Sequence, residues 1–212
     1  MQEQGLIARA LRVARDARFF AADQDIRHQT ASIFSSLFGA QEAVIVADGN
    51  TYEAAGRDVE ASFFRENQAQ YQPFIFGPHV YADDKCVQEL EQALRPHPGV
   101  PVAVGSGTIN DLTKLVSHRL KRPYMVVGTA ASMDGYAAFG ASILKDGSKE
   151  TIDCPGPRAV LADLDVIGRA PVRMNASGYA DLLASISTGG LACAMAQDGT
   201  PTLSQSRVPH DL

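Results

Sequence analysis

The segment PVAVGSGTINDLTK, residues 101–114, decides the fold. Residues 101–104 form a short apolar run, which is typical of a strand buried in a parallel sheet. Gly105, Ser106 and Gly107 end this run, and a helical apolar stripe follows, with Thr108 or Asn110 as a possible cap. A strand, a glycine turn and a helix in this order can present backbone N–H groups to a phosphate, because glycine permits close approach and the helix dipole favours an anion.

The spacing of this turn differs from two common phosphate-binding motifs. Asn110 stands where a Rossmann G-x-G-x-x-G motif would have its third glycine, and the Gly-Lys-Ser/Thr of a P-loop is missing. The pattern is instead G-S-G-x-x-x-D-x-x-K, which ends on Asp111 and Lys114. The motif alone therefore leaves two interpretations open, a phosphate-binding turn and a tight connection between a strand and a helix.

Strand and helix patterns alternate on both sides of this turn. Apolar runs predict strands over residues 43–47, 74–81, 124–127 and 158–167, and a hairpin over residues 143–152 that turns at Asp146-Gly147. Apolar periodicity predicts helices over residues 6–20, 29–38 and 83–94, and a helix that starts over residues 51–56. This alternation predicts an α/β fold whose residues 1–170 form a Rossmann-like domain with a parallel sheet.

Composition narrows the class of protein. The chain has 212 residues, of which 45% are apolar and 20% are charged, and its net charge of −5 argues against a nucleic-acid-binding surface. No apolar run approaches the ~18 residues of a membrane span, and the amino terminus has no apolar core of a signal peptide. Cys86, Cys154 and Cys193 form no C-x-x-C pair, which is typical of reduced thiols. We therefore expect a cytoplasmic protein.

Two acidic residues follow predicted strands. Asp48 comes directly after the strand at residues 43–47, where dinucleotide-binding folds often contact a ribose hydroxyl. Asp134 follows the small residues 128–132, where a carboxylate is well placed to bind a substrate hydroxyl. The alternatives are a helix cap for Asp48 and a plain Asp-Gly turn for Asp134.

The last third of the chain changes character. Residues 174–178 predict the start of a helix, and Asp181 precedes two leucines, so it is either an acid turned inward or a solvated one. An inward carboxylate needs a partner, and a metal ion would serve. No periodicity continues after Ser185, and we expect residues 185–212 to be an irregular, disordered tail.

Four segments in order, GSGTINDLTK, GTAASMDGYA, PRAVLADLDVI and SGYADLL, resemble the glycerol-1-phosphate dehydrogenase family over residues 40–184. This family is similar to glycerol dehydrogenases, iron-containing alcohol dehydrogenases and 3-dehydroquinate synthases. The resemblance implies a dinucleotide-binding α/β domain followed by an all-helical domain, of which residues 171–184 would be the first helix. The implied reaction reduces dihydroxyacetone phosphate to sn-glycerol 1-phosphate with NADH or NADPH, reversibly, in the cleft between the domains. It implies a small-molecule substrate, no nucleic acid and no membrane span, and a homo-oligomer for the full-length enzyme.

The resemblance also implies roles for individual residues. Asp48 would contact the adenosine ribose, Asp134 would hold the substrate, and Asp181 would be both a metal ligand and a substrate neighbour. The metal, zinc in most relatives and nickel or iron in others, would polarise the ketone as a Lewis acid. The implied contacts with the cofactor are Gly107, Thr108, Ile109, Asn110, Asp111, Thr129, Ala130, Ala131 and Ser132.

Two departures from the family pattern bear on activity. Ala137, Ala138 and Phe139 replace small hydroxylated residues, so a serine contact with the cofactor at position 138 is lost. The family's other metal ligands are two histidines on later helices, and here only His210 follows Asp181. Because a catalytic zinc takes about three protein ligands, we expect a C-terminally truncated or frame-shifted dehydrogenase product. An inactive dinucleotide-binding module and a dehydroquinate synthase-like lyase are the alternatives, and TAASMDG favours the dehydrogenase over the lyase.

Overall fold

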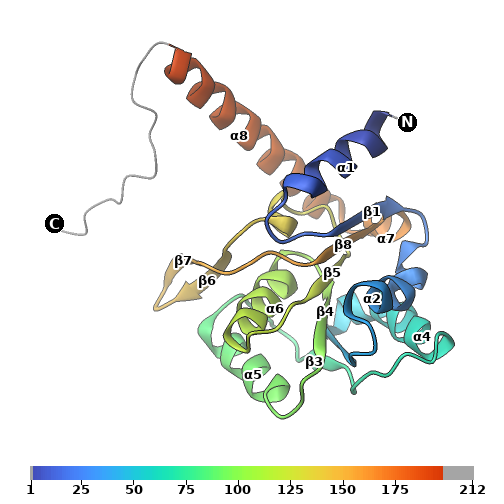
Figure 1. Cartoon of the computed structure of the whole chain (residues 1–212). Helices are drawn as coiled ribbons and strands as arrows, with labels where there is room; N and C mark the ends of the chain where they lie inside the picture. The colour runs from blue at the N-terminus through green and yellow to red at the C-terminus, as the bar shows by residue number, and fades with distance from the viewer. Residues whose placement is uncertain (1, 198–212) are drawn as a thin grey trace.

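Six parallel strands form the central sheet of the computed structural model, in the order β1-β8-β5-β4-β2-β3 (Figure 1). The structure describes residues 2–197, with side-chain surroundings for residues 7–184. The strands of this sheet are β1 (Phe19–Asp23), β2 (Ala43–Asp48), β3 (Phe74–Phe76), β4 (Val100–Gly105), β5 (Met125–Gly128) and β8 (Ala159–Asp163). The predicted α/β fold with a parallel Rossmann-like sheet is confirmed.

An antiparallel hairpin of β6 (Ala141–Lys145) and β7 (Ser148–Ile152) stands outside this sheet. Asp146 and Gly147 join the two strands with φ angles of 48° and 80°, the left-handed backbone that a two-residue hairpin turn requires. The hairpin that the sequence predicted at these two residues is confirmed.

Helices cover both faces of the sheet (Figure 1). The helices are α1 (Gln2–Val13), α2 (Thr30–Phe38), α3 (Gly49–Thr51), α4 (Arg57–Arg65), α5 (Asp84–Leu94), α6 (Gly107–Arg119), α7 (Leu164–Arg169) and α8 (Val172–Gln197), with short 3-10 helices η1 (Ile26–Gln29) and η3 (Gly135–Ala137) and a π-helical turn η2 (Tyr52–Gly56). Helices α2 and α4 pack on one face, and α5 and α6 pack on the other. Within β2, Ile45 packs against the layer of α2 and α4, and Val44 packs against the layer of α5 and α6. The strand is therefore apolar on both faces, as buried parallel strands are.

The order of the strands creates a crevice between β2 and β4. These strands are hydrogen-bonded neighbours, yet the chain leaves β2 toward α4 on one face and leaves β4 toward α6 on the other. Loops that depart in opposite directions leave a gap at the carboxyl ends of the two strands, which is where open α/β sheets bind their ligands. The fold therefore places Asp48 and the glycine turn on either side of this crevice.

Three predicted elements near the sheet have other boundaries. The strand predicted over residues 74–81 is β3, which ends at Phe76, before Gly77 and Pro78. The helix predicted over residues 6–20 ends at Val13, and Phe19 and Phe20 belong to strand β1. Strand β1 pairs in parallel with β8, far along the chain, so no local pattern marks it. The strand predicted over residues 158–167 ends at Asp163, whose carboxylate caps α7.

Helix α8 continues beyond the predicted boundary and extends away from the sheet layers (Figure 1). The helix predicted over residues 171–184 runs from Val172 to Gln197, so the prediction of irregular chain is wrong for residues 185–197. The remainder of that predicted tail, His210 included, lies outside the described residues. Among residues 2–197, no helix is long and apolar enough to cross a lipid bilayer.

Candidate cofactor and substrate site

The carboxyl ends of three adjacent strands bring the predicted site segments together. Asp48 ends β2, Gly105 ends β4 and Gly128 ends β5. Gly105 and Gly128 are register partners, and the N–H of Thr129 donates to the carbonyl of Gly105 at 3.1 Å. The loops that follow these strands therefore start side by side at the crevice.

Asp48 caps the helix that follows β2. Its Oδ1 accepts hydrogen bonds from the N–H groups of Asn50 at 2.8 Å and Thr51 at 2.9 Å, and its own N–H donates to the hydroxyl of Thr51 at 3.1 Å. This reciprocal capping box is the structural role that the sequence left as the alternative. Both cap bonds use Oδ1, so the arrangement is compatible with a ribose contact through Oδ2, which stays a prediction.

Helix α6 begins directly at the glycine turn. Ser106 is its N-cap and Gly107 its first residue, so the N–H groups of the first turn point out of the helix end, without partners in the helix. A cavity of about 270 Å³ opens beside this end, and Gly107, Thr108, Asp111 and Met133 contribute to its wall. A Cβ atom at position 107 would lie 3.2 Å from the sulfur of Met133, so a side chain at this position would crowd Met133 at the wall of the cavity. The structure thus has the geometry of an anion site at a helix N-terminus.

The next two residues of the motif face the protein interior. Ile109 is 1% exposed and Asn110 is fully buried. The Nδ2 of Asn110 donates to the carbonyl of Tyr136 at 3.4 Å, its Oδ1 accepts from the hydroxyl of Tyr124 at 3.1 Å, and its backbone N–H donates to the carbonyl of Ser106 at 3.0 Å. These side chains hold the turn in place and do not line the cavity, so a cofactor contact by Ile109 would involve only its backbone.

The last two polar residues of the motif anchor the chain that follows β5. Nζ of the buried Lys114 donates to the carbonyls of Ala138 at 3.1 Å and Gly140 at 2.9 Å, and lies 3.6 Å from Oδ1 of Asp111. Oδ2 of Asp111 accepts from the N–H of Ser142 at 3.2 Å. Burial raises the pKa of Asp111, an effect that the charge of Lys114 partly offsets. The D-x-x-K spacing is visible in the sequence and places Asp111 and Lys114 on the same face of the helix. Their anchoring role was not predicted from it.

The hydroxyl of Tyr136 holds the loop of small residues that follows β5. Tyr136 donates from its hydroxyl to the carbonyl of Ala130 at 2.6 Å. Burial raises the pKa of Tyr136 to about 12, so the hydroxyl keeps its proton at neutral pH. Thr129 and Ala130 are buried, whereas Ala131 is exposed and Ser132 half-exposed. Of the four predicted cofactor contacts in this loop, the last two are therefore the accessible ones.

Helix α8 docks on the same loop through three residues on one face. Asn175 accepts at Oδ1 from the N–H of Ala131 and donates from Nδ2 to the carbonyl of Ile167, both at 3.0 Å. Oδ2 of Asp181 accepts from the N–H of Asp134 at 3.1 Å. A Cβ atom at Gly178 would overlap the carbonyl oxygen of Ala131. The structure thus brings the two predicted catalytic acids together.

The sequence analysis did not predict a docking role for two of these residues. Asn175 and Gly178 were interpreted only as part of a helix start, and their spacing of three residues from each other and from Asp181 is the signal that was available. Asp181 itself is exposed, which favours the solvated interpretation over the inward one.

The described residues do not form a metal centre. They contain no group of three or more His, Cys, Asp or Glu side chains that could hold an ion. A catalytic zinc takes about three protein ligands, and Asp181 would supply one. Cys86 and Cys154 are buried free thiols. The role of Asp181 as a metal ligand therefore stays a prediction that requires ligands from outside the described residues.

Comparisons with known proteins agree with this geometry. Residues 21–171 match a family described as iron-containing alcohol dehydrogenase. The chain is 35% identical over 156 residues to a glycerol-1-phosphate dehydrogenase (NAD(P)+) of Halalkalibacterium halodurans, an alignment that covers 68% of this chain and 37% of that protein. A protein of the same name from Pyrococcus furiosus is 33% identical over 168 residues, which cover 77% of this chain and 46% of that protein. The chain therefore spans less than half the length of these curated relatives.

A solved structure supports the fold. The crystal structure of glycerol dehydrogenase from Schizosaccharomyces pombe is similar with a TM-score of 0.70 and 22% sequence identity, and the match covers 81% of this chain and 43% of the other. At this identity the likeness extends to the architecture alone.

Proposed function

The chain belongs to the iron-containing alcohol dehydrogenase family, and we propose that it is the dinucleotide-binding part of an NAD(P)-dependent glycerol-1-phosphate dehydrogenase. The observation that carries this proposal is the open N-terminus of α6 at the crevice between β2 and β4, beside the cavity at Gly107. A helix end of this kind favours a pyrophosphate through its N–H groups and its dipole.

The proposed cofactor follows the edge of the sheet. The pyrophosphate would contact the N–H groups of Gly107 and Thr108 and the backbone of Ile109, and the ribose would contact Oδ2 of Asp48. Residues 129–132 would line the nicotinamide side, where Ala131 and Ser132 are accessible. In this arrangement the protein binds and orients the cofactor, which itself carries the hydride.

The proposed substrate is dihydroxyacetone phosphate, with sn-glycerol 1-phosphate as the product of its reduction. The names of the curated relatives support this substrate, and so does the proximity of Asp134 and Asp181 at the end of the cofactor loop. These acids would position the substrate hydroxyl groups beside the nicotinamide, and such positioning converts a bimolecular encounter into an intramolecular one. Because the described residues do not fit a metal ion, we assign no step to the metal.

A fluorescence titration with NADH tests the cofactor site. We expect saturable binding by the unmodified chain and about tenfold weaker binding by Gly107→Ala, because the added methyl would stand where the pyrophosphate approaches. The fold should tolerate this change, since the neighbouring Met133 is flexible. Gly168→Ala is the matched control, because a Cβ there meets nothing within 4 Å. Absence of binding at millimolar NADH, or equal binding by Gly107→Ala, would contradict the proposal.

A second candidate function is a dinucleotide-binding module without catalysis. It is favoured by the lack of a metal-binding cluster among residues that the structure describes. An assay of dihydroxyacetone phosphate reduction with NADH and added Zn²⁺, Ni²⁺ or Fe²⁺ separates the two. Binding of NADH without turnover would favour the module, and turnover would favour the dehydrogenase.

A further inference from the structure

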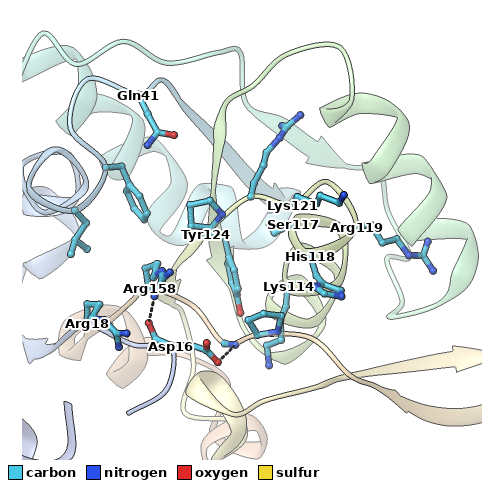
Figure 2. Close-up of a pocket in the computed structure, with 16 residues that line it drawn as sticks. Asp16, Arg18, Gln41, Lys114, Ser117, His118, Arg119, Lys121, Tyr124 and Arg158 are labelled. Atoms are coloured by element: carbon cyan, nitrogen blue, oxygen red, sulfur yellow. Dashed lines mark hydrogen bonds between the residues drawn. The ribbon is translucent and has the colours of Figure 1, made fainter. Parts of the chain in front are cut away.

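A second and larger cleft opens at the opposite edge of the sheet, at the amino ends of β1, β8 and β5. Its volume is about 1080 Å³. The N–H of Arg158 donates to the carbonyl of Tyr124, and the N–H of Arg18 donates to the carbonyl of Arg158, each at 2.8 Å. These bonds align the residues that precede the three strands, so Arg18 and Arg158 stand next to each other (Figure 2).

Positive charge gathers around this cleft although the chain carries a net charge of −5. Seven basic residues line it, namely Arg18, Lys114, His118, Arg119, Lys121, Arg122 and Arg158, and Asp16 is the acid among the lining residues. Figure 2 shows Arg18 and Arg158 on one side of Tyr124, and His118, Arg119 and Lys121 on the other.

Most of this charge is not neutralised by carboxylates. The guanidinium groups of Arg18, Arg122 and Arg158 donate to backbone carbonyls, which leave the net charge unchanged. Arg119 pairs with Glu91 at 3.2 Å, but within the described part of the chain Lys121, Arg122 and Arg158 have no carboxylate within ion-pair distance. The carboxylate of Asp16 accepts from the N–H of Gly156 at 3.1 Å.

A buried hydroxyl faces this cleft without a partner. Ser117 is 1% exposed and lines the cleft, and its Oγ has no hydrogen-bond partner among the described residues. Buried polar atoms are almost always paired, so an unpaired one at a cavity points to a ligand atom. Interaction with the dipole of α6 is an alternative reason for basic residues near the C-terminus of this helix. The dipole explains neither the unpaired hydroxyl of Ser117 nor the position of Arg158, which precedes strand β8.

The floor of the cleft is apolar. Leu37, Phe38, Pro123, Tyr124 and Pro155 line it between the basic groups. We propose that this cleft binds a small phosphate-bearing molecule with an aromatic or apolar part, at a site separate from the cofactor turn. The phosphate would pair with Arg122, Arg158 and Lys121 and accept from Ser117, and the apolar part would lie on Tyr124 and the prolines.

The test uses ADP as the ligand and the unmodified chain, with backbone amide chemical shifts and calorimetry as readouts. We expect shifts at residues 117–122, 124, 156 and 158, which carry backbone N–H groups, whether or not further shifts occur at residues 105–111. Pyrophosphate, which lacks the aromatic part, should bind this cleft more weakly than ADP. Shifts confined to residues 105–111, or equal affinity of the cleft for both ligands, would overturn the proposal.

Three variants sharpen this test. Arg122→Gln should weaken ADP binding at the cleft about tenfold, because a charge-assisted hydrogen bond to phosphate is lost. Arg65→Gln is its matched control, since Arg65 and Arg122 each donate to one backbone carbonyl at 3.2 Å. Lys121 has a φ of 56°, which asparagine tolerates, so Lys121→Asn should fold normally and still bind ADP more weakly. Unchanged affinity in both Arg122→Gln and Lys121→Asn would overturn the proposal.

Discussion

At the scale of single residues, some residues of the glycine-turn motif line the cavity and others anchor the neighbouring chain. Gly107 and Thr108 line the cavity, where their predicted contact with the cofactor stays a prediction, whereas Asn110 and Lys114 bond to the chain at residues 136–140. The sequence located all of these residues but did not distinguish their roles. Which side of α6 faces the sheet and which faces a ligand depends on how the loop after β5 returns across the helix, and only the tertiary structure contains that information.

Replacing Lys114 should destabilise the fold. Lys114→Met leaves the buried carbonyl of Gly140, the part-buried carbonyl of Ala138 and the carboxylate of Asp111 without the ammonium group of Lys114, and loss of one partner of a buried charge costs about 3 kcal/mol in unfolding free energy. Urea denaturation measures this difference. Lys85→Met is the control, because Lys85 is exposed, and it should change stability little. Equal stability of the two variants would contradict the anchoring role of Lys114.

The pair of Asp163 and Arg27 should make stability depend on acidity. Burial alone would raise the pKa of Asp163, but the N–H and guanidinium of Arg27, at 3.0 and 2.9 Å, together with the N–H of Val166, bring it below the ordinary value. A lowered pKa in the folded state gives stability that is present above the unfolded pKa, about 3.9, and is lost as pH falls through the folded pKa.

Asp163→Asn tests this linkage. At pH 7 the variant should lose about 2 kcal/mol of unfolding free energy, because the half-buried guanidinium of Arg27 loses its charge-assisted bond to Asp163 and keeps its ion pairs with Asp25 and Asp58. The difference from the unmodified chain should shrink as the pH is lowered below about 4, where the unfolded carboxyl takes up its proton. Denaturation series at pH 7, 4 and 3 measure it. A difference that stays constant across this range would show that the pair contributes no pH dependence.

At the scale of elements, the helices and strands with a local sequence pattern were predicted correctly, whereas a strand that depends on pairing with a distant segment was not predicted. The strands at β2, β4 and β5, the hairpin and helix α5 carry their own patterns and turn residues, and all appear where expected. The residues of strand β1 are partly exposed, and the strand is stabilised by its pairing with β8. Asp163, which caps α7, lies within an apolar run, so the sequence did not indicate a cap there. Helix α8 was predicted to end at 184 because glycines and small residues obscure its periodicity.

The docking of α8 on the loop at residues 129–134 gives a prediction at this scale. Gly178→Ala should keep or raise helix content, since alanine favours helices, yet weaken NADH binding, because the new methyl overlaps the carbonyl of Ala131 and must displace the loop. Circular dichroism and NADH fluorescence measure the two effects. Ser177→Ala is the neighbouring control, because the exposed hydroxyl of Ser177 donates to the carbonyl of Arg173 in the same helix. Normal NADH binding by Gly178→Ala would contradict the docking contact.

At the scale of the whole molecule, α8 exposes apolar side chains on the face beside its docking face. Tyr179 is 65% exposed, Leu182 48% and Leu183 47%. Clustered exposed apolar groups promote association. We expect the chain to self-associate with rising concentration and Leu182→Glu to reduce this, as measured by light scattering. Tyr81→Glu, at an exposed aromatic position in the loop before α5, is the control. Identical scattering by Leu182→Glu and the unmodified chain would place association elsewhere.

The two edges of the sheet give the molecule two distinct chemical environments. The carboxyl edge has the helix N-terminus and the loop bound by α8, and the amino edge has the basic cleft. The proposed function depends most on the binding of the nicotinamide cofactor at the carboxyl edge. Mapping backbone amide chemical shifts during a titration with NADH measures this binding directly. We predict that the largest shifts occur at residues 105–111 and 129–134 and that Gly107→Ala reduces them. Shifts confined to residues 117–124 and 155–158, or none at millimolar NADH, would contradict it.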